Sequence, residues 1–247
     1  MKAIILAAGM GDRLGPLTTN TPKCLVEVNG ITILENALEC LNRTGIQECV
    51  LVVGHFAKKI KRRVGNNFKD IKIIYVTNEI FENTGNIYSL WLAEKYLRDD
   101  IILLEGDIFF ESEVIEKLCK CGSPDVIVVD DYTEYMDGTA VVANDEKAVE
   151  MILKKDQDDD FQYDGKLKTV NIYQFSMSFM ENCFIPTLNS YIEDGYLDEF
   201  YELVISKVIK SGKIQIPVLS VNGLKWFEID TYEDLKKCEK LFGDIDR

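Results

Sequence analysis

A short apolar run near the N-terminus, residues 3–8, places the strongest limit on the fold of this chain. It ends directly at the glycine loop Gly9-Met10-Gly11. A continuous apolar segment of this length is typical of a strand that is buried on both faces, as in parallel sheets covered by helices. Similar runs recur at 49–53, 71–76, 101–104 and 126–129, and amphipathic stretches of helical length lie near 32–43, 56–65, 86–97 and 112–121. This alternation predicts an α/β fold with a doubly wound, mostly parallel sheet.

The rhythm of the sequence changes after about residue 130. Shorter segments follow at 139–143 and 147–154, then a polar loop at 155–167 and a strand at 169–176. We expect residues 131–176, approximately, to form a small lid insertion within a single domain that spans residues 1–247. Helices are predicted near 178–192 and 197–210, strands at 213–219 and 225–229, and a closing helix capped by Thr231.

Composition and charge exclude several classes of partner. The chain has 247 residues, and 47% of them are hydrophobic, which is enough for one packed core. A net charge of -14 opposes binding to nucleic acid, whose phosphates are bound by basic faces. The first apolar run is too short for a signal peptide or a membrane span, so we expect a cytoplasmic protein. The seven cysteines are scattered and form no C-x-x-C pair, which favours reduced core thiols over a zinc site.

The glycine loop lies where an open α/β sheet binds its ligand, just beyond a strand end. Gly9 and Gly11 let backbone N–H groups approach phosphate, while Arg13 and Lys23 supply positive charge. A dinucleotide fingerprint would need a third glycine where Leu14 stands, and a P-loop would need Gly-Lys-Ser/Thr. Both are absent. The loop is therefore either a different kind of phosphate site or a structural turn.

Acidic residues follow two of the predicted strands. Glu105-Gly106-Asp107 ends the strand at 101–104, and Glu228-Ile229-Asp230 ends the short strand near the C-terminus. Mg²⁺ prefers one or two carboxylates together with phosphate oxygens and water. Asp107 and Asp230 are the predicted ligands, with Glu228 as a third candidate on the same face of its strand. The competing interpretation is that these residues are helix caps or solvated charges.

Residues 6–18, LAAGMGDRLGPLT, and the following Pro22-Lys23 resemble the nucleotidyltransferase signature L-A-A-G-x-G-x-R-L-x-P-L-T…P-K. The resemblance implies a Rossmann-like nucleotidyltransferase fold whose loop wraps a triphosphate. It implies that Arg13 and Lys23 neutralise the phosphates and that Asp107 and Asp230 bind the metal ion. The nucleotide-binding residues expected in this part of the chain are Leu6, Ala8, Gly9, Gly11, Asp12, Arg13 and Lys23.

Residues 83–91, NTGNIYSLW, are similar to a segment that contacts the base in cytidylyltransferases for phosphocholine and 2-aminoethylphosphonate. This resemblance implies that Gly85, Asn86 and Ser89 contact the nucleotide, and it favours CTP. The side chains of Asn86 and Ser89 offer the hydrogen bonds that the edge of cytosine requires. Asn86 is equally suited to cap the helix that follows.

Aromatic and acidic residues in the second half of the chain point to an acceptor with an ammonium group, because aromatic faces and carboxylates bind such cations. The predicted acceptor-binding residues are Tyr132, Asp137, Tyr173, Tyr201, Trp226 and Glu228. The competing interpretation is that the tyrosines pack the lid. Lys168 is predicted as a third catalytic cation beside Arg13 and Lys23, with Lys154 as the alternative, although either is equally a plain surface lysine.

The predicted function is Mg²⁺-dependent transfer of CMP from CTP to a small amino-bearing phosphate or phosphonate. Phosphocholine, phosphoethanolamine, 2-aminoethylphosphonate and a phosphorylated amino acid are all suitable acceptors. No general base is required, since the second pKa of a phosphate is about 6, and the only histidine, His55, is expected to be structural. The alternatives are a sugar-1-phosphate nucleotidyltransferase and a non-catalytic nucleotide-binding subunit. Partners are expected to be small molecules, without nucleic acid or membrane, and a homodimer is compatible with the sequence.

Overall fold

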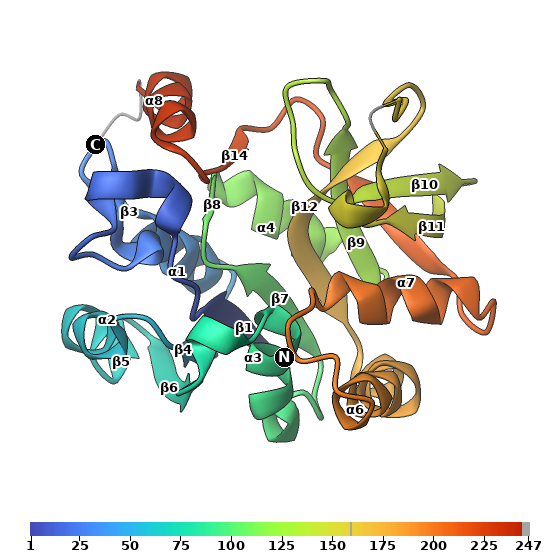
Figure 1. The fold of residues 1–247 in the computed structure, drawn as a ribbon, viewed down its shortest axis with the longest axis horizontal. Coiled ribbons are helices and arrows are strands. Elements are labelled where there is room, and N and C mark those ends of the chain that lie inside the picture. Colours follow the sequence, from blue (N-terminus) through green and yellow to red (C-terminus); the bar gives the residue numbers. More distant parts are fainter. Residues whose placement is uncertain (159, 244–247) are drawn as a thin grey trace.

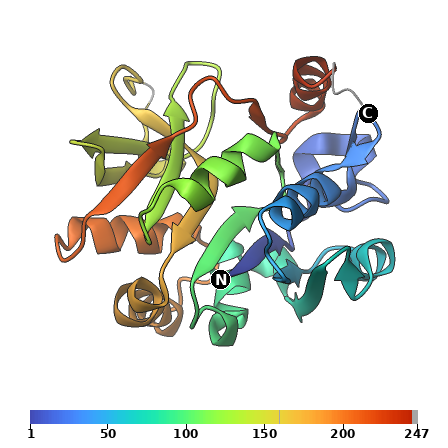
Figure 2. The same cartoon turned by 180° about the vertical axis from the view of Figure 1, so that it is seen from behind.

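The computed structural model describes residues 1–158 and 160–243, and Asp159, in the predicted polar loop, lies outside them. Ten strands form one sheet in the order β10-β11-β13-β9-β12-β7-β1-β4-β6-β5. Helices cover both faces of this sheet (Figure 1 and Figure 2). The predicted α/β fold is therefore confirmed.

The first half of the sheet is parallel, as predicted. β1 (Lys2–Ala7) lies between β4 (Glu48–Val53) and β7 (Ile101–Glu105), and β6 (Ile71–Thr77) pairs with β4. β5 (Asn67–Phe68) closes this edge as an antiparallel strand. Alternate side chains of β1 enter the two hydrophobic clusters on opposite faces of the sheet. This double burial explains why the strand reads as a continuous apolar run.

The second half of the sheet is mixed, so the prediction of a mostly parallel sheet is wrong there. β12 (Leu167–Phe175) lies between β7 and β9 (Val126–Asp131) and is antiparallel to both. β10 (Ala140–Asn144) and β11 (Lys147–Ile152) form an antiparallel hairpin, whereas β13 (Ile216–Ser220) is parallel to β9. No helix long enough for a crossover separates β9 from β12 among the described residues, and strands joined by loops reverse direction.

The segment 131–176, predicted as a lid, belongs largely to the sheet. β10 and β11 extend its edge, and β12 lies near its middle. Its longer connections outside the strands are the loop 132–139 and the described residues of the stretch between β11 and β12, 153–158 and 160–166. Both loops border the candidate site described below.

Helices pack on the two faces as two separate groups. α1 (Ile33–Arg43), α2 (Ala57–Val64) and α4 (Ser112–Lys120) cover one face, and α4 lies in front of the sheet in Figure 2. The other face is covered by α3 (Asn86–Leu92), by α6 (Ile185–Glu193) with the preceding turns α5 (Met177–Phe179) and Met180–Phe184, and by α7 (Glu202–Lys210). Thr231 caps α8 (Tyr232–Leu241) in a capping box with Asp234, which confirms the predicted start of that helix.

Among the described residues, no helix combines the length and the apolar character that crossing a membrane requires. The cysteines are free thiols. Cys24, Cys40, Cys49 and Cys238 are buried, as predicted, whereas Cys119 is exposed.

α7 begins five residues later than the predicted range 197–210, because the preceding segment runs along the start of α3. The N–H of Gly85 donates to the carbonyl of Leu197 at 2.9 Å, and the N–H of Ile87 donates to the carbonyl of Glu199 at 3.1 Å. A Cβ atom at position 85 would lie 2.2 Å from the Glu199 carbonyl oxygen. Glycine is required there so that the two backbones can approach each other.

We predict that Gly85→Ala lowers the free energy of unfolding by about 1 to 3 kcal/mol, since backbone atoms must move to accept the methyl group. Thermal and denaturant unfolding would measure the change. Gly9→Ala is the matched control, because a Cβ atom at position 9 meets nothing within 4 Å. The control is expected to leave stability unchanged or to raise it by up to about 1 kcal/mol. Equal effects of the two substitutions would contradict the close approach at Gly85.

Candidate active site

Pairing between two short strands brings the predicted metal ligands together. β14 (Trp226–Glu228) is antiparallel to β8 (Ile108–Phe110), with Glu228 opposite Ile108. The N–H of Ile229 then donates to the carbonyl of Asp107 at 3.0 Å. Asp107 and Asp230 therefore meet at the carboxyl end of β7, beside the glycine loop. The predicted convergence of the two acidic strand ends is present in the structure.

Both predicted phosphate-binding cations contact these carboxylates. Lys23 Nζ lies 2.7 Å from Asp107 Oδ2 and 2.6 Å from Asp230 Oδ1. Arg13 Nη2 lies 2.7 Å from the same oxygen of Asp230. Burial by itself lowers the pKa of the Lys23 ammonium, but the two carboxylates outweigh burial and raise that pKa above its usual value. Lys23 is therefore a permanent cation.

The glycine loop holds Lys23 in place. Gly11 has a φ of 72°, and a Cβ atom there would lie 2.8 Å from Lys23 Cβ, so a side chain at this position would push the lysine aside. The buried Thr18 hydroxyl lies 2.9 Å from the Gly11 carbonyl oxygen. The loop and the lysine thus form one packed unit, although twelve residues of sequence separate Gly11 from Lys23.

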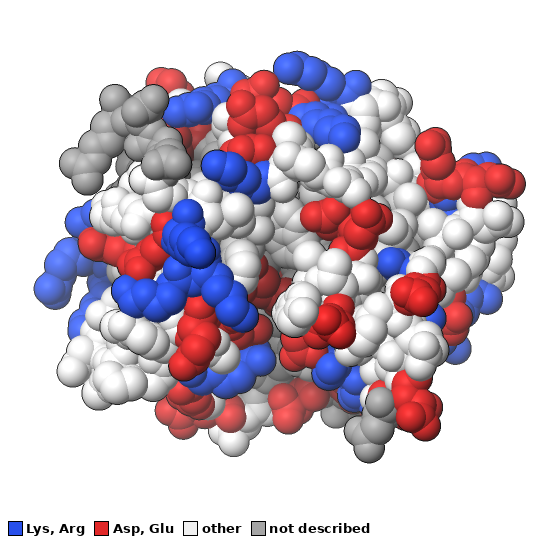
Figure 3. Space-filling model, turned by 90° about the horizontal axis from the view of Figure 1, so that it is seen from above, with Lys and Arg blue, Asp and Glu red and all other residues white. Residues whose placement is uncertain are grey.

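A cavity of about 360 Å³ opens above this unit. We refer to it as the phosphate cavity. Its lining residues are Leu6, Ala7, Gly9, Met10, Gly11, Asp12, Arg13, Lys23, Cys24, Gly106, Asp107 and Asp230. In Figure 3 a hollow near the middle of the face has basic side chains along one side, and acidic side chains also lie along it. A cavity lined by backbone N–H groups, two cations and carboxylates suits a phosphate chain bound with a cation.

A second cavity, of about 140 Å³, shares Leu6, Gly9 and Asp107 with the first. Ala8 lines it together with Gly85, Asn86 and Ser89, the residues of the segment predicted to contact the base. Both polar groups of Asn86 already have partners: Nδ2 donates to Glu105 at 3.1 Å, and Oδ1 accepts from the N–H of Tyr201 at 2.8 Å. Asn86 therefore ties the start of α7 to β7, and these two bonds use one of its two Nδ2 hydrogens and one of its two Oδ1 lone pairs.

Sequence reasoning missed Asn78, which organises this second cavity. Its side chain is buried and donates to Thr84 Oγ1 at 2.9 Å and to Ser89 Oγ at 3.0 Å. Its position directly after β6 was the available signal, since ligand sites lie at the ends of such strands. The sole histidine, His55, packs against Phe56 and Phe81 and donates its backbone N–H to Ala8, in keeping with the structural role expected for it.

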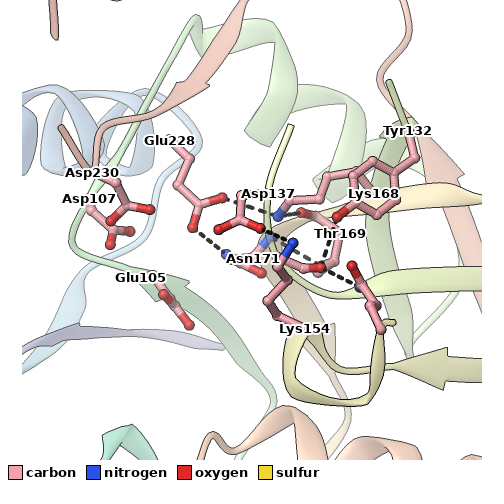
Figure 4. A network of polar contacts seen from close by, with 12 residues as sticks. Glu105, Asp107, Tyr132, Asp137, Lys154, Lys168, Thr169, Asn171, Glu228 and Asp230 are labelled. Carbon is pink, nitrogen blue, oxygen red and sulfur yellow. Dashed lines mark hydrogen bonds and ion pairs between the residues drawn. The ribbon is translucent and has the colours of Figure 1, made fainter. Parts of the chain in front are cut away.

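A third cavity, also of about 360 Å³, lies on the β12 side of the carboxylates. We refer to it as the acceptor-side cavity. It shares Arg13, Asp107 and Asp230 with the phosphate cavity, and its other lining residues are Glu105, Asp137, Gly138, Thr139, Leu153, Lys154, Lys155, Asn171, Phe200, Glu202 and Glu228. Asp137 forms an ion pair of 2.8 Å with Lys154 at its rim. Figure 4 shows Glu228 between the aspartates and the two lysines at positions 154 and 168.

The two predicted acceptor-side lysines differ in exposure. Lys168 is only 1% exposed, and its Nζ lies 3.1 Å from Glu228 Oε2 and 2.8 Å from the carbonyl of Thr169. It is neither a surface lysine nor a free cation in the acceptor-side cavity. Lys154 is exposed and borders that cavity. Lys168 instead holds the Glu228 carboxylate, whose other oxygen accepts from Asn171 at 3.3 Å.

The predicted tyrosines do not line the acceptor-side cavity, which is a correction to the predicted acceptor site. Tyr173 and Tyr201 have no exposed surface, because both rings point into the core beneath the cavity. Tyr132 packs against Tyr163, and its hydroxyl donates to the Gly138 carbonyl at 3.0 Å. Trp226 borders a smaller neighbouring cavity of about 110 Å³ with Lys168 and Glu228. The tyrosines thus pack the protein, as the competing interpretation held.

Two glutamates that are not among the predicted site residues are part of this site. Glu105 offers an oxygen that lies within 4.8 Å of oxygens from Asp107 and Glu228. Burial, followed by repulsion from neighbouring carboxylates including Glu202, raises the pKa of Glu105 well above its ordinary value. Burial is also the main reason why the pKa of Glu202 rises to about 7. Glu202 lies in the first turn of α7, where sequence alone indicates an ordinary surface charge.

Comparison with known proteins identifies the family at this point. Residues 3–162 of the chain match the family of MobA-like NTP transferase domains. The chain belongs to this family. The matched region contains the glycine loop, Lys23 and Asp107, so the phosphate cavity lies within it, whereas Asp230 comes from the segment that follows. The predicted nucleotidyltransferase resemblance is thereby confirmed.

Individual relatives extend the similarity over almost the whole chain. It is 32% identical to the CMP-5'-(3-aminopropyl)phosphonate synthase of Streptomyces rubellomurinus over 98% of its own length, but it spans only 39% of that relative. It is 26% identical to the choline-phosphate cytidylyltransferase of Streptococcus pneumoniae over 98% of both chains. A solved structure of CTP:phosphocholine cytidylyltransferase from Streptococcus pneumoniae superimposes with a TM-score of 0.77, 23% identity and 98% coverage of both chains. The fold is thus that of a family of NTP transferases.

The buried Glu202 predicts a pH-dependent effect on stability. Its pKa in the folded protein is about 7, above the ordinary 4.5, so folding favours the protonated form. The free energy of unfolding therefore falls as the pH rises from 4.5 to about 7, because the folded state must then hold a buried carboxylate. We predict that Glu202→Gln raises the free energy of unfolding at about pH 8.5 by about 1 to 3 kcal/mol, and by less at about pH 5.5.

Chemical unfolding of both proteins at the two pH values would test this prediction. Glu193→Gln, which removes one charge at the exposed end of α6, is the control and is expected to have the same small effect at both. A Glu202→Gln protein that is less stable than the original at the higher pH would contradict the assignment.

Proposed function

We propose that this protein transfers CMP from CTP to a small amino-bearing phosphate or phosphonate and releases pyrophosphate. The observation that carries the proposal is the meeting of Arg13, Lys23, Asp107 and Asp230 between two cavities of similar size. Such an arrangement allows two phosphorylated molecules to be held on opposite sides of one charged centre. The similarity to a CMP-5'-(3-aminopropyl)phosphonate synthase and to a choline-phosphate cytidylyltransferase supports cytidine as the transferred nucleoside.

The reaction needs no proton transfer. An oxygen of the acceptor phosphate or phosphonate attacks the α-phosphorus of CTP, the bond between that phosphorus and the oxygen bridging to the β-phosphorus breaks, and pyrophosphate leaves with the bonding electrons. At neutral pH the acceptor is already largely dianionic, since its second pKa is about 6. The protein therefore has to position two polyanions in line and offset their repulsion. Lys23 and Arg13 are the cations placed for that role.

The contacts of Lys23 suggest how it acts on the substrate. In the structure its ammonium group is balanced by Asp107 and Asp230, so the cation is held at the centre of the site before any ligand arrives. A triphosphate in the phosphate cavity offers further oxygens to the same ammonium and to Arg13. We infer that both side chains turn partly from the aspartates to the phosphates when CTP binds.

The residues at this centre also fit Mg²⁺, which prefers hard oxygen ligands. Asp107 Oδ1 is buried and has no hydrogen-bond partner among the described residues, as expected for an oxygen that awaits a cation. Asp107 and Asp230 would hold the ion. Glu228 is a weaker candidate, because both of its oxygens already have partners. When bound, Mg²⁺ would neutralise charge that develops on the triphosphate.

The first test is pyrophosphate release from CTP, UTP, GTP and dTTP in the presence of phosphoethanolamine, phosphocholine, 2-aminoethylphosphonate, phosphoserine or glucose 1-phosphate. We expect turnover with CTP and an amino-bearing acceptor, abolished by EDTA and restored by excess Mg²⁺. Turnover with glucose 1-phosphate alone would assign the protein to sugar-nucleotide synthesis. CTP binding without turnover of any acceptor would favour a regulatory role.

Substitutions at the charged centre should separate binding from chemistry. We predict that Lys23→Met and Asp107→Asn each lower kcat/KM for CTP by at least about 100-fold, because each removes several kcal/mol of charge stabilisation in the transition state. Lys59→Met, which removes a cation from the exposed face of α2, is the matched control and should retain activity. Nearly full activity in either site variant would contradict the assigned roles.

A further inference from the structure

The acceptor-side cavity contains buried oxygens that have no hydrogen-bond partner. Glu202 is 5% exposed and Asn171 is 4% exposed. Glu202 Oε2 and Asn171 Oδ1 both lack a partner among the described residues, and both side chains line the cavity. A buried carboxylate or amide oxygen without a partner costs free energy, on the order of 1 to 3 kcal/mol. A donor that enters the cavity, such as a water molecule or an N–H group of a ligand, would satisfy these oxygens.

The cations that line the cavity already have carboxylate partners. Arg13 is paired with Asp230, Lys154 with Asp137 and Lys155 with Glu199, and Lys168 nearby is paired with Glu228. Neither Glu105 nor Glu202 takes part in an ion pair in the part of the chain that the structure describes. We call the part of the cavity lined by Glu105, Asn171 and Glu202 its inner end. This end has too few positive charges and too few hydrogen-bond donors for the oxygens it contains.

The cavity also lacks the aromatic faces that bind quaternary ammonium groups. Tyr173 and Tyr201 are entirely buried below it, and Phe200, at 56% exposed, is the aromatic residue in its lining. Cages for trimethylated nitrogen rely on several rings, because such a nitrogen has no N–H group and interacts through its charge and its methyl groups. The polar oxygens found here require hydrogen-bond donors instead.

We propose that the acceptor-side cavity selects a primary ammonium group over a trimethylammonium group, through hydrogen bonds to the buried oxygens of Glu202 and Asn171. This inference rests on the proposed function and narrows its acceptor class. A primary ammonium has three N–H donors, which match the oxygens available. A trimethylammonium would bury the same oxygens without pairing them and would bring its methyl groups against carboxylates.

A single small acceptor can extend from the charged centre into the acceptor-side cavity. Arg13, Asp107 and Asp230 line the phosphate cavity as well as the acceptor-side cavity, so the two spaces meet at the charged centre. An acceptor with its phosphate beside Arg13 and its ammonium beside Glu202 would present its attacking oxygen to the bound nucleotide. The acidic inner end and the basic phosphate end also fix the direction in which the acceptor enters.

Phosphoethanolamine and phosphocholine provide the sharpest test, because they differ only in three N-methyl groups. With CTP and Mg²⁺, we expect kcat/KM for phosphoethanolamine to exceed that for phosphocholine by at least about 100-fold, as in sites whose buried polar groups reject an analogue that cannot pair with them. Glu202→Gln should raise KM for phosphoethanolamine by about 10- to 100-fold with KM for CTP unchanged. Glu193→Gln is the control, because it removes the same charge at an exposed position. It should change neither the KM for phosphoethanolamine nor the KM for CTP.

Each outcome of this test decides the inference. Equal or better use of phosphocholine would overturn it while leaving the proposed function standing. An unchanged KM for phosphoethanolamine in the Glu202→Gln protein would also overturn it, provided that the variant unfolds at the same or a higher temperature than the original. Transfer of CMP to neither amine while glucose 1-phosphate is used would instead remove the proposed function on which the inference rests.

Discussion

The ion pairs of Lys23 with Asp107 and Asp230 connect three parts of the chain that the sheet alone would leave separate. Lys23 follows the glycine loop after β1, Asp107 follows β7, and Asp230 follows β14 near the C-terminus. Each carboxylate by itself would be a partly buried negative charge of considerable cost. Together with the lysine they form a balanced centre, and the cavities on either side take their position from it.

The rest of the fold follows from the need to present this centre from a rigid support. β1 and β7 are parallel neighbours, so their carboxyl ends place the glycine loop and Asp107 side by side. The antiparallel strand β12 then lies beside β7 and carries Lys168 and Asn171 to the opposite side of the carboxylates. The parallel half thus supplies the phosphate cavity, and the mixed half supplies most of the acceptor-side cavity. A uniformly parallel sheet would have placed a helical connection where β12 delivers these side chains.

Much of this arrangement could be predicted from the sequence, and the failures have identifiable causes. The buried strands, the loop and the convergence of Asp107 with Asp230 were predictable, because apolar runs and glycines report local structure and parallel strands end at one edge. The direction of β12 was not predictable, since an apolar run has the same pattern in a parallel strand and in an antiparallel strand. The burial of Tyr173 and Tyr201 was not predictable either, because it depends on which elements pack against each ring. The burial of Glu202 could not be predicted, because a glutamate in a first helical turn is usually a favourable surface charge.

The charge balance of the proposed reaction gives a physical reason for the carboxylates in the acceptor-side cavity. In the proposed reaction two polyanions approach each other at the charged centre, and Arg13 and Lys23 would offset only part of their repulsion. An acceptor that carries its own ammonium group brings a compensating charge, but this helps only if the group points away from the triphosphate. We infer that Glu202 at the inner end of the cavity favours that direction, because an ammonium group can donate hydrogen bonds to its carboxyl oxygens whereas a phosphate cannot. The burial of these oxygens costs stability in the empty protein, and an incoming cation recovers that cost at the moment when the acceptor is correctly oriented.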